Sequence, residues 1–134
     1  MKNTQNKNET AEVTILIVED REGVRHYLRV LVSESFPKCH CFEARDGEEA
    51  VTMASLHLPD IVLMDIGLPK MNGIEATRRI KETVPKARIV IVTNHEACEY
   101  KKAAAIAGAS AYVLKNRMNS ELIPIVTKLL SQTQ

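Results

Sequence analysis

The stretch Asp60-Ile-Val-Leu-Met-Asp65 decides how the rest of the chain is expected to fold. Its four consecutive apolar residues lie between Pro59 and Pro69. They are too few for a helix, and they fit a short strand that is buried on both faces of a parallel sheet. Asp65 then follows the carboxyl end of this strand, at the edge where open parallel α/β sheets bind ligands. A functional site is therefore expected around Asp65.

Strand and helix signals alternate on both sides of this stretch. Runs of β-branched and apolar residues predict strands, and amphipathic runs with capping residues predict helices. Strands are expected at 13–18, 39–44, 61–64, 88–92 and 110–114, and helices at 21–35, 46–57, 72–84, 95–106 and around 122–130. Asp46 and Asn72 are the expected capping residues of two of these helices. Pro124 removes a backbone donor from the last helix and predicts a late start or a kink there.

Five strands that alternate with five helices predict an α/β fold with a parallel sheet covered on both faces. For a doubly wound fold of this size we expect the flavodoxin-like strand order 2-1-3-4-5. Residues 12–134 are expected to form one domain. Residues 1–11 are rich in Asn, Lys, Thr and Gln and are expected to form a disordered polar tail.

Composition narrows the classes of function. The net charge is only +1, so no bulk field favours direct nucleic-acid binding or an anionic membrane. No apolar run approaches the roughly 20 residues that span a bilayer, and the first residues lack the apolar core of a secretory signal. Three cysteines cannot all pair within the chain, which favours a reducing cytoplasm.

The expected strand order brings polar residues from four strand ends to one edge of the sheet. These residues are Glu19-Asp20, Asp65, Thr93 and Lys115. Three carboxylates that share a pocket need compensating cations, and Mg²⁺ binds through carboxylates while keeping waters and phosphate oxygens. Lys115 adds a point charge suited to phosphate. The hypothesis that follows is a Mg²⁺-dependent phosphorylation of Asp65, whose carboxylate can act as the nucleophile.

The same residues resemble those of a known family, the receiver domains of two-component response regulators. Glu19-Asp20 is similar to the acid pair of that family, Asp65 to its phospho-acceptor and Lys115 to its phosphate-binding lysine. Thr93 is similar to its switch hydroxyl and Tyr112 to its switch aromatic. The resemblance extends from about Val13 to Leu130. The run Leu68-Pro-Lys-Met-Asn-Gly-Ile-Glu-Ala-Thr-Arg-Arg79 also resembles receivers of the NarL type.

The resemblance implies a role for each position. Asp20, Asp65 and the backbone carbonyl of Gly67 would bind Mg²⁺, with Glu19 acting nearby or through water. Asp65 would accept a phosphoryl group from the phosphohistidine of a sensor histidine kinase or a phosphotransfer protein. Thr93 and Tyr112 would then reorient and change a face made by the fourth helix, the fifth strand and the fifth helix.

That face would bind an output domain, a downstream protein or a second copy of the chain as a homodimer. The protein would catalyse its own phosphorylation and dephosphorylation without being a metabolic enzyme.

Three positions depart from the pattern of the family. Asn116 follows Lys115 where the family usually has a proline with a cis peptide, so the loop is expected to be trans or strained. Asn94 occupies a place usually held by a small residue. Gly67 is expected to leave one rim of the pocket bare and open to attacking water. These departures bear on rates and on the strength of switching.

Three other functions stand beside the phosphorylated receiver. The first is a receiver-like interaction module that acts independently of phosphorylation, which Asn94 and Asn116 leave open. The second is a phosphatase of the dehalogenase type, which also uses an Asp nucleophile but normally has a second Asp where this chain has Gly67. The third is a dinucleotide-binding enzyme, disfavoured because no glycine fingerprint follows the first strand.

The remaining cysteines and histidines are expected to be structural. Alternation places the thiols of Cys39 and Cys41 on one strand face and His40 on the other, which is poor geometry for one metal ion. We therefore expect Cys39 and Cys41 to pack as small apolar residues. The other three histidines show no partner spacing and are expected on the surface; these are His26, His57 and His95.

Overall fold

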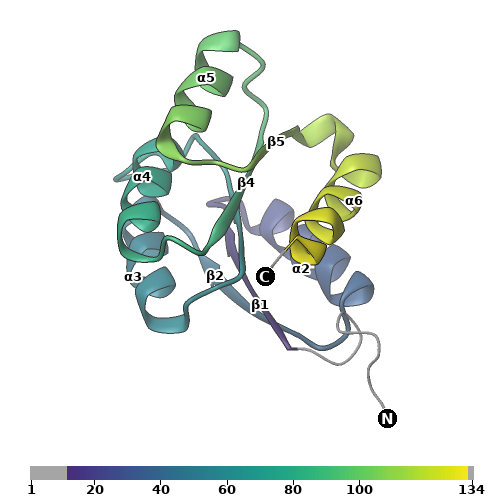
Figure 1. Ribbon diagram of the computed structural model, residues 1–134. Coiled ribbons are helices and arrows are strands. Elements are labelled where there is room, and N and C mark those ends of the chain that lie inside the picture. Colours follow the sequence, from purple (N-terminus) through teal and green to yellow (C-terminus); the bar gives the residue numbers. More distant parts are fainter. Residues whose placement is uncertain (1–11, 133–134) are drawn as a thin grey trace.

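The computed structural model describes residues 12–132 (Figure 1). The polar tail expected at residues 1–11 lies outside these residues. The elements in chain order are β1 (Val13–Val18), α2 (Glu22–Ser35), β2 (Cys39–Ala44), α3 (Gly47–His57), β3 (Ile61–Met64), α4 (Gly73–Thr83), β4 (Arg88–Thr93), α5 (Cys98–Ala107), β5 (Ala111–Leu114), the 3-10 turn η1 (Lys115–Arg117) and α6 (Met118–Ser131). The strands form one parallel sheet in the order β2-β1-β3-β4-β5. The flavodoxin-like fold class and its strand order are thereby confirmed.

Strand β3 lies at the centre of the sheet, and all four of its residues are buried. Asp60, just before it, ties the amino ends of β3 and β1 together. Its backbone N–H donates to the Thr14 carbonyl at 2.8 Å, and its Oδ2 accepts from the Thr14 N–H at 2.8 Å. The two aspartates that flank β3 therefore lie at opposite ends of one strand, and only Asp65 lies at the carboxyl edge.

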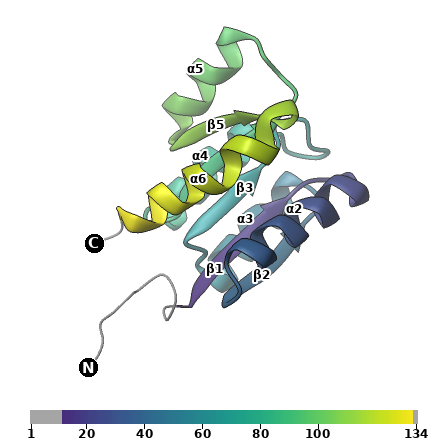
Figure 2. The same ribbon diagram turned by 90° about the vertical axis from the view of Figure 1, so that its right-hand side faces the viewer.

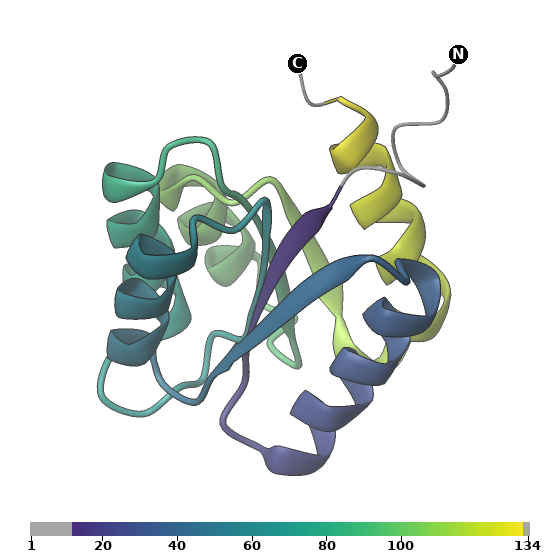
Figure 3. The same ribbon diagram turned by 90° about the horizontal axis from the view of Figure 1, so that it is seen from below.

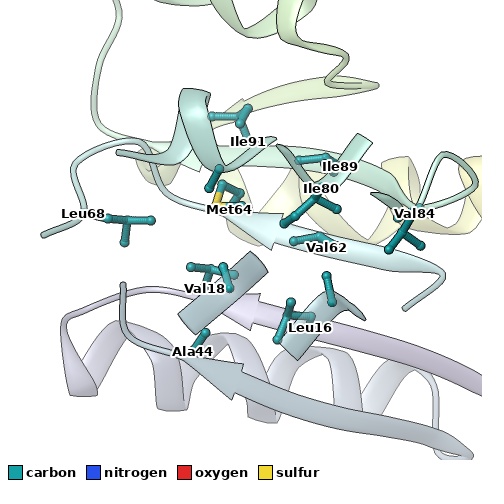
Figure 4. Packing of buried hydrophobic residues seen from close by; sticks show 14 of the residues in the cluster. Leu16, Val18, Ala44, Val62, Met64, Leu68, Ile80, Val84, Ile89 and Ile91 are labelled. Carbon is teal, nitrogen blue, oxygen red and sulfur yellow. The ribbon is translucent and has the colours of Figure 1, made fainter. Parts of the chain in front are cut away.

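The sheet is covered by helices on both faces, as Figures 2 and 3 show. Helices α2 and α6 pack on one face, and α3, α4 and α5 pack on the other. Alternate residues of each central strand point to opposite faces, as the pleat of a strand requires. In β3, Ile61 and Leu63 belong to the core on the α2–α6 side. Val62 and Met64 belong to the core on the other side, where they lie near Ile80 of α4 (Figure 4). Burial on both faces explains why β3 is an unbroken apolar run.

Two helices begin at the capping residues expected from the sequence. Asp46 accepts a hydrogen bond from the Glu49 N–H at 2.7 Å at the start of α3. Asn72 accepts from the N–H groups of Ile74 and Glu75 at 2.8 and 3.0 Å at the start of α4. Each cap satisfies backbone donors that have no partner inside the helix.

Two helix starts differ from the expectation. Helix α5 begins at Cys98, not near His95, because the preceding segment remains a loop in which the His95 carbonyl accepts a hydrogen bond from the Tyr112 hydroxyl at 2.8 Å. Helix α6 begins at Met118, six residues before Pro124, so the late start predicted for it is wrong. Pro124 is exposed, and water can satisfy the carbonyl that its missing N–H leaves without a partner.

Cys39 and Cys41 pack against the core under α2, as expected. Their Sγ atoms lie 3.6 Å apart. Burial, reinforced by the neighbouring Cys39, raises the pKa of the Cys41 thiol to about 11, so this side chain stays neutral and behaves as an apolar residue.

The histidines divide between exposed and partly buried positions. His26 is exposed, as expected. His57 is half-buried, because its ring stacks on Phe42 with centroids 3.7 Å apart. His95 is also half-buried and approaches the candidate site. The surface position is therefore confirmed for His26, and His57 and His95 are only partly exposed.

No helix within residues 12–132 is long and apolar enough to cross a membrane.

Candidate functional site

The carboxyl edge of the sheet gathers the side chains that the strand order predicted. Glu19 and Asp20 follow β1, Asp65 follows β3, Thr93 is the last residue of β4, and Lys115 follows β5. Because all five strands run in the same direction, these positions lie at one edge of the sheet.

Asp65 is held by contacts to its backbone and to both carboxylate oxygens. Its N–H donates to the Val18 carbonyl at 3.1 Å, which continues the pairing of β1 with β3. Its Oδ1 accepts from the Ile66 N–H at 2.8 Å, and its Oδ2 accepts from Lys115 Nζ at 3.2 Å. The residue is only 7% exposed, so its carboxylate has a fixed orientation with a narrow access to solvent.

Glu19 is a buried carboxylate beside the same ammonium group. Its Oε1 lies 2.8 Å from Lys115 Nζ, a close ion pair outside hydrogen-bond angles, and its Oε2 accepts from the Arg21 N–H at 3.1 Å. Burial raises the pKa of Glu19 above its usual value and outweighs the lowering effect of Lys115 and Arg21. Lys115 thus contacts both Glu19 and Asp65. Because this single ammonium group faces several carboxyl groups, the pocket holds more acidic than basic groups.

The three acidic side chains are suited to a hard divalent cation. Ligand oxygens of Glu19, Asp20 and Asp65 all lie within 4.8 Å of one another. Asp20 is exposed and the other two are buried, so the oxygens converge from the solvent side and from the protein interior. Mg²⁺ prefers oxygen ligands and retains several waters, which a half-open carboxylate cluster permits. The donor set therefore fits Mg²⁺.

Thr93 and Tyr112 are linked through His95. The Thr93 hydroxyl is fully buried, and its Oγ1 accepts from the His95 N–H at 3.4 Å. The Tyr112 hydroxyl donates to the His95 carbonyl at 2.8 Å. Burial raises the pKa of Tyr112, which keeps its hydroxyl protonated as a donor. The loop before α5 therefore connects the two side chains for which a switching role was expected.

His95 lies beside Gly67. Gly67 is exposed, as expected for a bare rim, and a Cβ atom built on it would lie 3.6 Å from His95 Nε2, so the imidazole borders this rim. The two residues line a hollow of about 400 Å³ together with Ile66, Asn72, Ile74, Glu75 and Tyr100. The His95 ring also packs against Tyr100, with centroids 4.6 Å apart.

The structure shows where the two asparagines that depart from the family pattern lie. Asn94 is exposed. Asn116 lies in the turn η1, and the described residues contain no cis peptide, so the Lys115–Asn116 bond is trans. The first of the two outcomes expected for this loop is thus the observed one.

Sequence reasoning missed two residues at this edge. His95 was assigned to the surface, although its position two residues after Thr93 places it in the loop beside the pocket. Arg25 was not singled out from the sequence, yet its Nη1 donates to the Glu19 carbonyl at 3.0 Å. The available signal was an arginine in the first turns of the helix that follows the acid pair.

The raised pKa of Glu19 predicts a difference in the pH dependence of stability between the wild type and Glu19→Gln without metal. A carboxyl whose pKa is higher in the folded than in the unfolded chain binds its proton more readily when folded. Protonation of Glu19 then adds stability as the pH falls through the folded pKa, and the gain is complete below the unfolded value. We expect the unfolding free energy of the wild type minus that of Glu19→Gln to increase as the pH is lowered from neutral toward the pKa of an unfolded glutamate.

Urea unfolding in EDTA at several pH values measures this difference. A difference that stays constant or decreases toward acidic pH would contradict the raised pKa.

Comparisons with known proteins agree with this geometry. The family model for the response regulator receiver domain matches residues 15–127. The chemotaxis protein CheY of Halobacterium salinarum is 37% identical over 117 residues, which cover 87% of this chain and 96% of CheY. The transcriptional regulatory protein DegU of Brevibacillus brevis is 33% identical over 126 residues, which cover 90% of this chain and 51% of DegU.

Among solved structures, a two-component response regulator of the LuxR family from Aurantimonas sp. SI85-9A1 superimposes with a TM-score of 0.84 at 37% identity. The match covers 92% of this chain and 89% of that chain. This chain spans about half the length of several curated relatives, including DegU and the YxjL protein of Bacillus subtilis.

Proposed function

The chain belongs to the family of response regulator receiver domains, and we propose that it is a phosphorylatable signal receiver of a two-component system. In this proposal Asp65 accepts a phosphoryl group from a histidine kinase or a phosphotransfer protein. One observation carries the proposal. The Asp65 carboxylate lies at the carboxyl edge of the sheet, bound by Lys115 and within 4.8 Å of the oxygens of an acid pair.

The proposed reaction needs positioning and charge neutralisation more than it needs further covalent chemistry. A carboxylate oxygen of Asp65 attacks the phosphorus atom of the partner's phosphohistidine. The P–N bond breaks, its electron pair stays on the imidazole nitrogen, and an acyl phosphate forms on Asp65. Lys115 Nζ lies 3.2 Å from Asp65 Oδ2, within hydrogen-bonding distance, and supplies positive charge for the incoming phosphoryl oxygens.

Asp20, Asp65 and the Gly67 carbonyl are the proposed Mg²⁺ ligands, with Glu19 acting beside them. The ion would neutralise charge on the phosphoryl oxygens. Glu19 has a second role in this proposal, because its ion pair with Lys115 holds the ammonium group over the pocket. Autodephosphorylation by water would complete the cycle, and no metabolic reaction is proposed.

The proposed switch uses Thr93 and Tyr112. A phosphoryl group on Asp65 would attract the Thr93 hydroxyl, which now accepts from the His95 N–H. Movement of this loop would alter the bond from the Tyr112 hydroxyl to the His95 carbonyl. The phosphoryl group can shift the equilibrium between the two arrangements only by the difference between its interaction free energies with them.

The proposed reporting surface consists of α5, β5 and α6, which correspond to the fourth helix, fifth strand and fifth helix of the family. Its proposed partners are an output domain, a downstream protein or a second copy of the chain. The receiver would comprise residues 12–134 and act in the cytoplasm, without direct contact to nucleic acid.

Beryllofluoride, which mimics a phosphoryl group, tests the proposal. We expect it to shift the amide NMR signals of Thr93, His95 and Tyr112 when Mg²⁺ is present and to leave them unchanged in EDTA. Asp65→Asn, titrated in the same way, is the control that must not respond. The second candidate function is an interaction module that acts independently of phosphorylation. An unchanged wild-type spectrum in Mg²⁺ with beryllofluoride would favour that module.

A further inference from the structure

Arg25 connects the acid pair Glu19-Asp20 to Glu43 on the edge strand β2. Its Nη1 donates to the Glu19 carbonyl at 3.0 Å, and its Nε donates to Glu43 Oε1 at 2.8 Å. The side chain is only 11% exposed, although its neighbours His26 and Tyr27 on α2 are exposed. A guanidinium can make both contacts at once because its donors are held in one rigid plane.

The contact to the Glu19 carbonyl bears on Asp20. The carbonyl of Glu19 and the N–H of Asp20 belong to the same planar peptide unit, so a bond that fixes one also fixes the other. The N–H of Glu19 is held as well, since it donates to the Ala44 carbonyl at 3.1 Å. Asp20 is exposed, so packing does not fix its side chain. The direction in which its carboxylate projects is then set by the backbone that Arg25 orients.

Glu43 holds the Arg25 guanidinium in place. Its Oε1 accepts from Arg25, and its Oε2 accepts from Arg29 Nη1 at 2.6 Å. Burial acts to raise the pKa of Glu43, but the hydrogen bonds from Arg25 and Arg29 outweigh it and lower that pKa below its usual value. Glu43 therefore stays ionised at neutral pH. Glu43 lies on β2, where it pairs with Ile17 of β1. Ile17 precedes Glu19 by two residues.

We propose that Arg25 is a positioning residue for Mg²⁺. Held by Glu43, it orients the peptide between Glu19 and Asp20 and thereby directs the Asp20 carboxylate toward the metal. This inference rests on the proposed function, because it takes Asp20 to be a metal ligand. Arg25 itself touches neither the metal nor Asp65 in this role.

Arg29 supplies a matched control for Arg25. Both arginines lie on α2, one turn apart, and both bind Glu43, but only Arg25 binds the Glu19 carbonyl. We expect Arg25→Met to raise the Mg²⁺ dissociation constant by about tenfold, a usual effect of removing a partner of a metal ligand. We expect Arg29→Met to leave it within about twofold of the wild type.

Isothermal titration with Mg²⁺ alone measures both constants. Arg25→Lys keeps the positive charge but replaces the rigid donor fork by one ammonium group, so its dissociation constant should fall between those of the wild type and Arg25→Met. This variant also keeps the test possible if Arg25→Met does not fold. Circular dichroism and urea unfolding check the fold of each variant.

A second measurement tests the backbone geometry at Asp20 in the metal-free protein. In the metal-free protein we expect the amide NMR signal of Asp20 to move in Arg25→Met and to stay in place in Arg29→Met. At saturating Mg²⁺, acetyl-phosphate labelling of Arg25→Met should return toward the wild-type rate, because the nucleophile is intact. Labelling is expressed per folded molecule, because bound Mg²⁺ also stabilises the folded state by mass action; an arginine that only stabilised the fold would leave the labelling rate per folded molecule unchanged at every Mg²⁺ concentration.

The outcomes separate the inference from the proposed function. Equal effects of Arg25→Met and Arg29→Met on Mg²⁺ affinity, or no effect of either, overturn the positioning role. Asp20→Asn tests the site itself. If Asp20→Asn binds Mg²⁺ as well as the wild type does, the proposed metal site fails and the inference fails with it. If Asp20→Asn loses affinity and Arg25→Met does not, only the inference fails.

Discussion

Asp65→Asn is expected to abolish phosphoryl incorporation from acetyl phosphate while the fold stays intact. The amide is nearly isosteric with the carboxylate, and its Oδ1 can still accept the bond from the Ile66 N–H. It lacks the anionic oxygen that attacks phosphorus, so no acyl phosphate can form. The substitution also removes one of three clustered carboxylates, which relieves repulsion in the metal-free protein. We expect a loss of labelling of about a hundredfold or more.

Asp60→Asn is the matched control for this prediction. It makes the same chemical change at the other end of β3, where an amide oxygen can still accept from the Thr14 N–H. Labelling followed by intact-protein mass spectrometry should be normal in Asp60→Asn and absent in Asp65→Asn. If Asp65→Asn is labelled at the wild-type rate, Asp65 is not the phospho-acceptor.

The fold was predictable because its signals are local and agree with one another. The apolar run before Asp65 fixed the central strand, and the caps at Asp46 and Asn72 marked two helix starts. The alternation of strands and helices then left few topologies, since parallel connections are short and right-handed. The side chains at the carboxyl edge followed from the strand order alone.

The details that were missed depend on tertiary contacts. His95 was expected to open a helix, but the bond from the Tyr112 hydroxyl to its carbonyl keeps that segment in a loop. Arg25 was not expected at this edge, but its Nε donates to Glu43 on β2, which holds the side chain inward. No periodicity or spacing in the sequence reports such pairs, because their members are 17 and 18 residues apart.

At Gly73, the packing of α4 is coupled to the position of the proposed nucleophile. A Cβ atom there would lie 1.9 Å from the backbone oxygen of Asp65 and 2.9 Å from Cα of Ile66. Both are backbone atoms, so neither can rotate away as a side chain would. The Gly73 N–H also donates to the Ile66 carbonyl at 2.9 Å, which anchors the start of α4 on the segment that carries the proposed nucleophile.

Gly73→Ala is therefore expected to lower the free energy of unfolding by about 3 kcal/mol, the upper range for an overpacked site. The protein that remains folded should also be labelled more slowly, because the added methyl group displaces Asp65 from Lys115. Urea unfolding measures the first effect, and labelling per folded molecule measures the second.

Gly23→Ala separates the steric effect from the general effect of replacing a glycine. A Cβ atom at Gly23 meets nothing within 4 Å, and the residue lies in α2. Alanine has the better helix propensity, so this variant should be about 0.5 kcal/mol more stable than the wild type and should be labelled normally. If Gly73→Ala were as stable as Gly23→Ala, α4 would be able to move away from β3 at little cost. The orientation of Asp65 would then have to depend on its bonds to Ile66 and Lys115 alone.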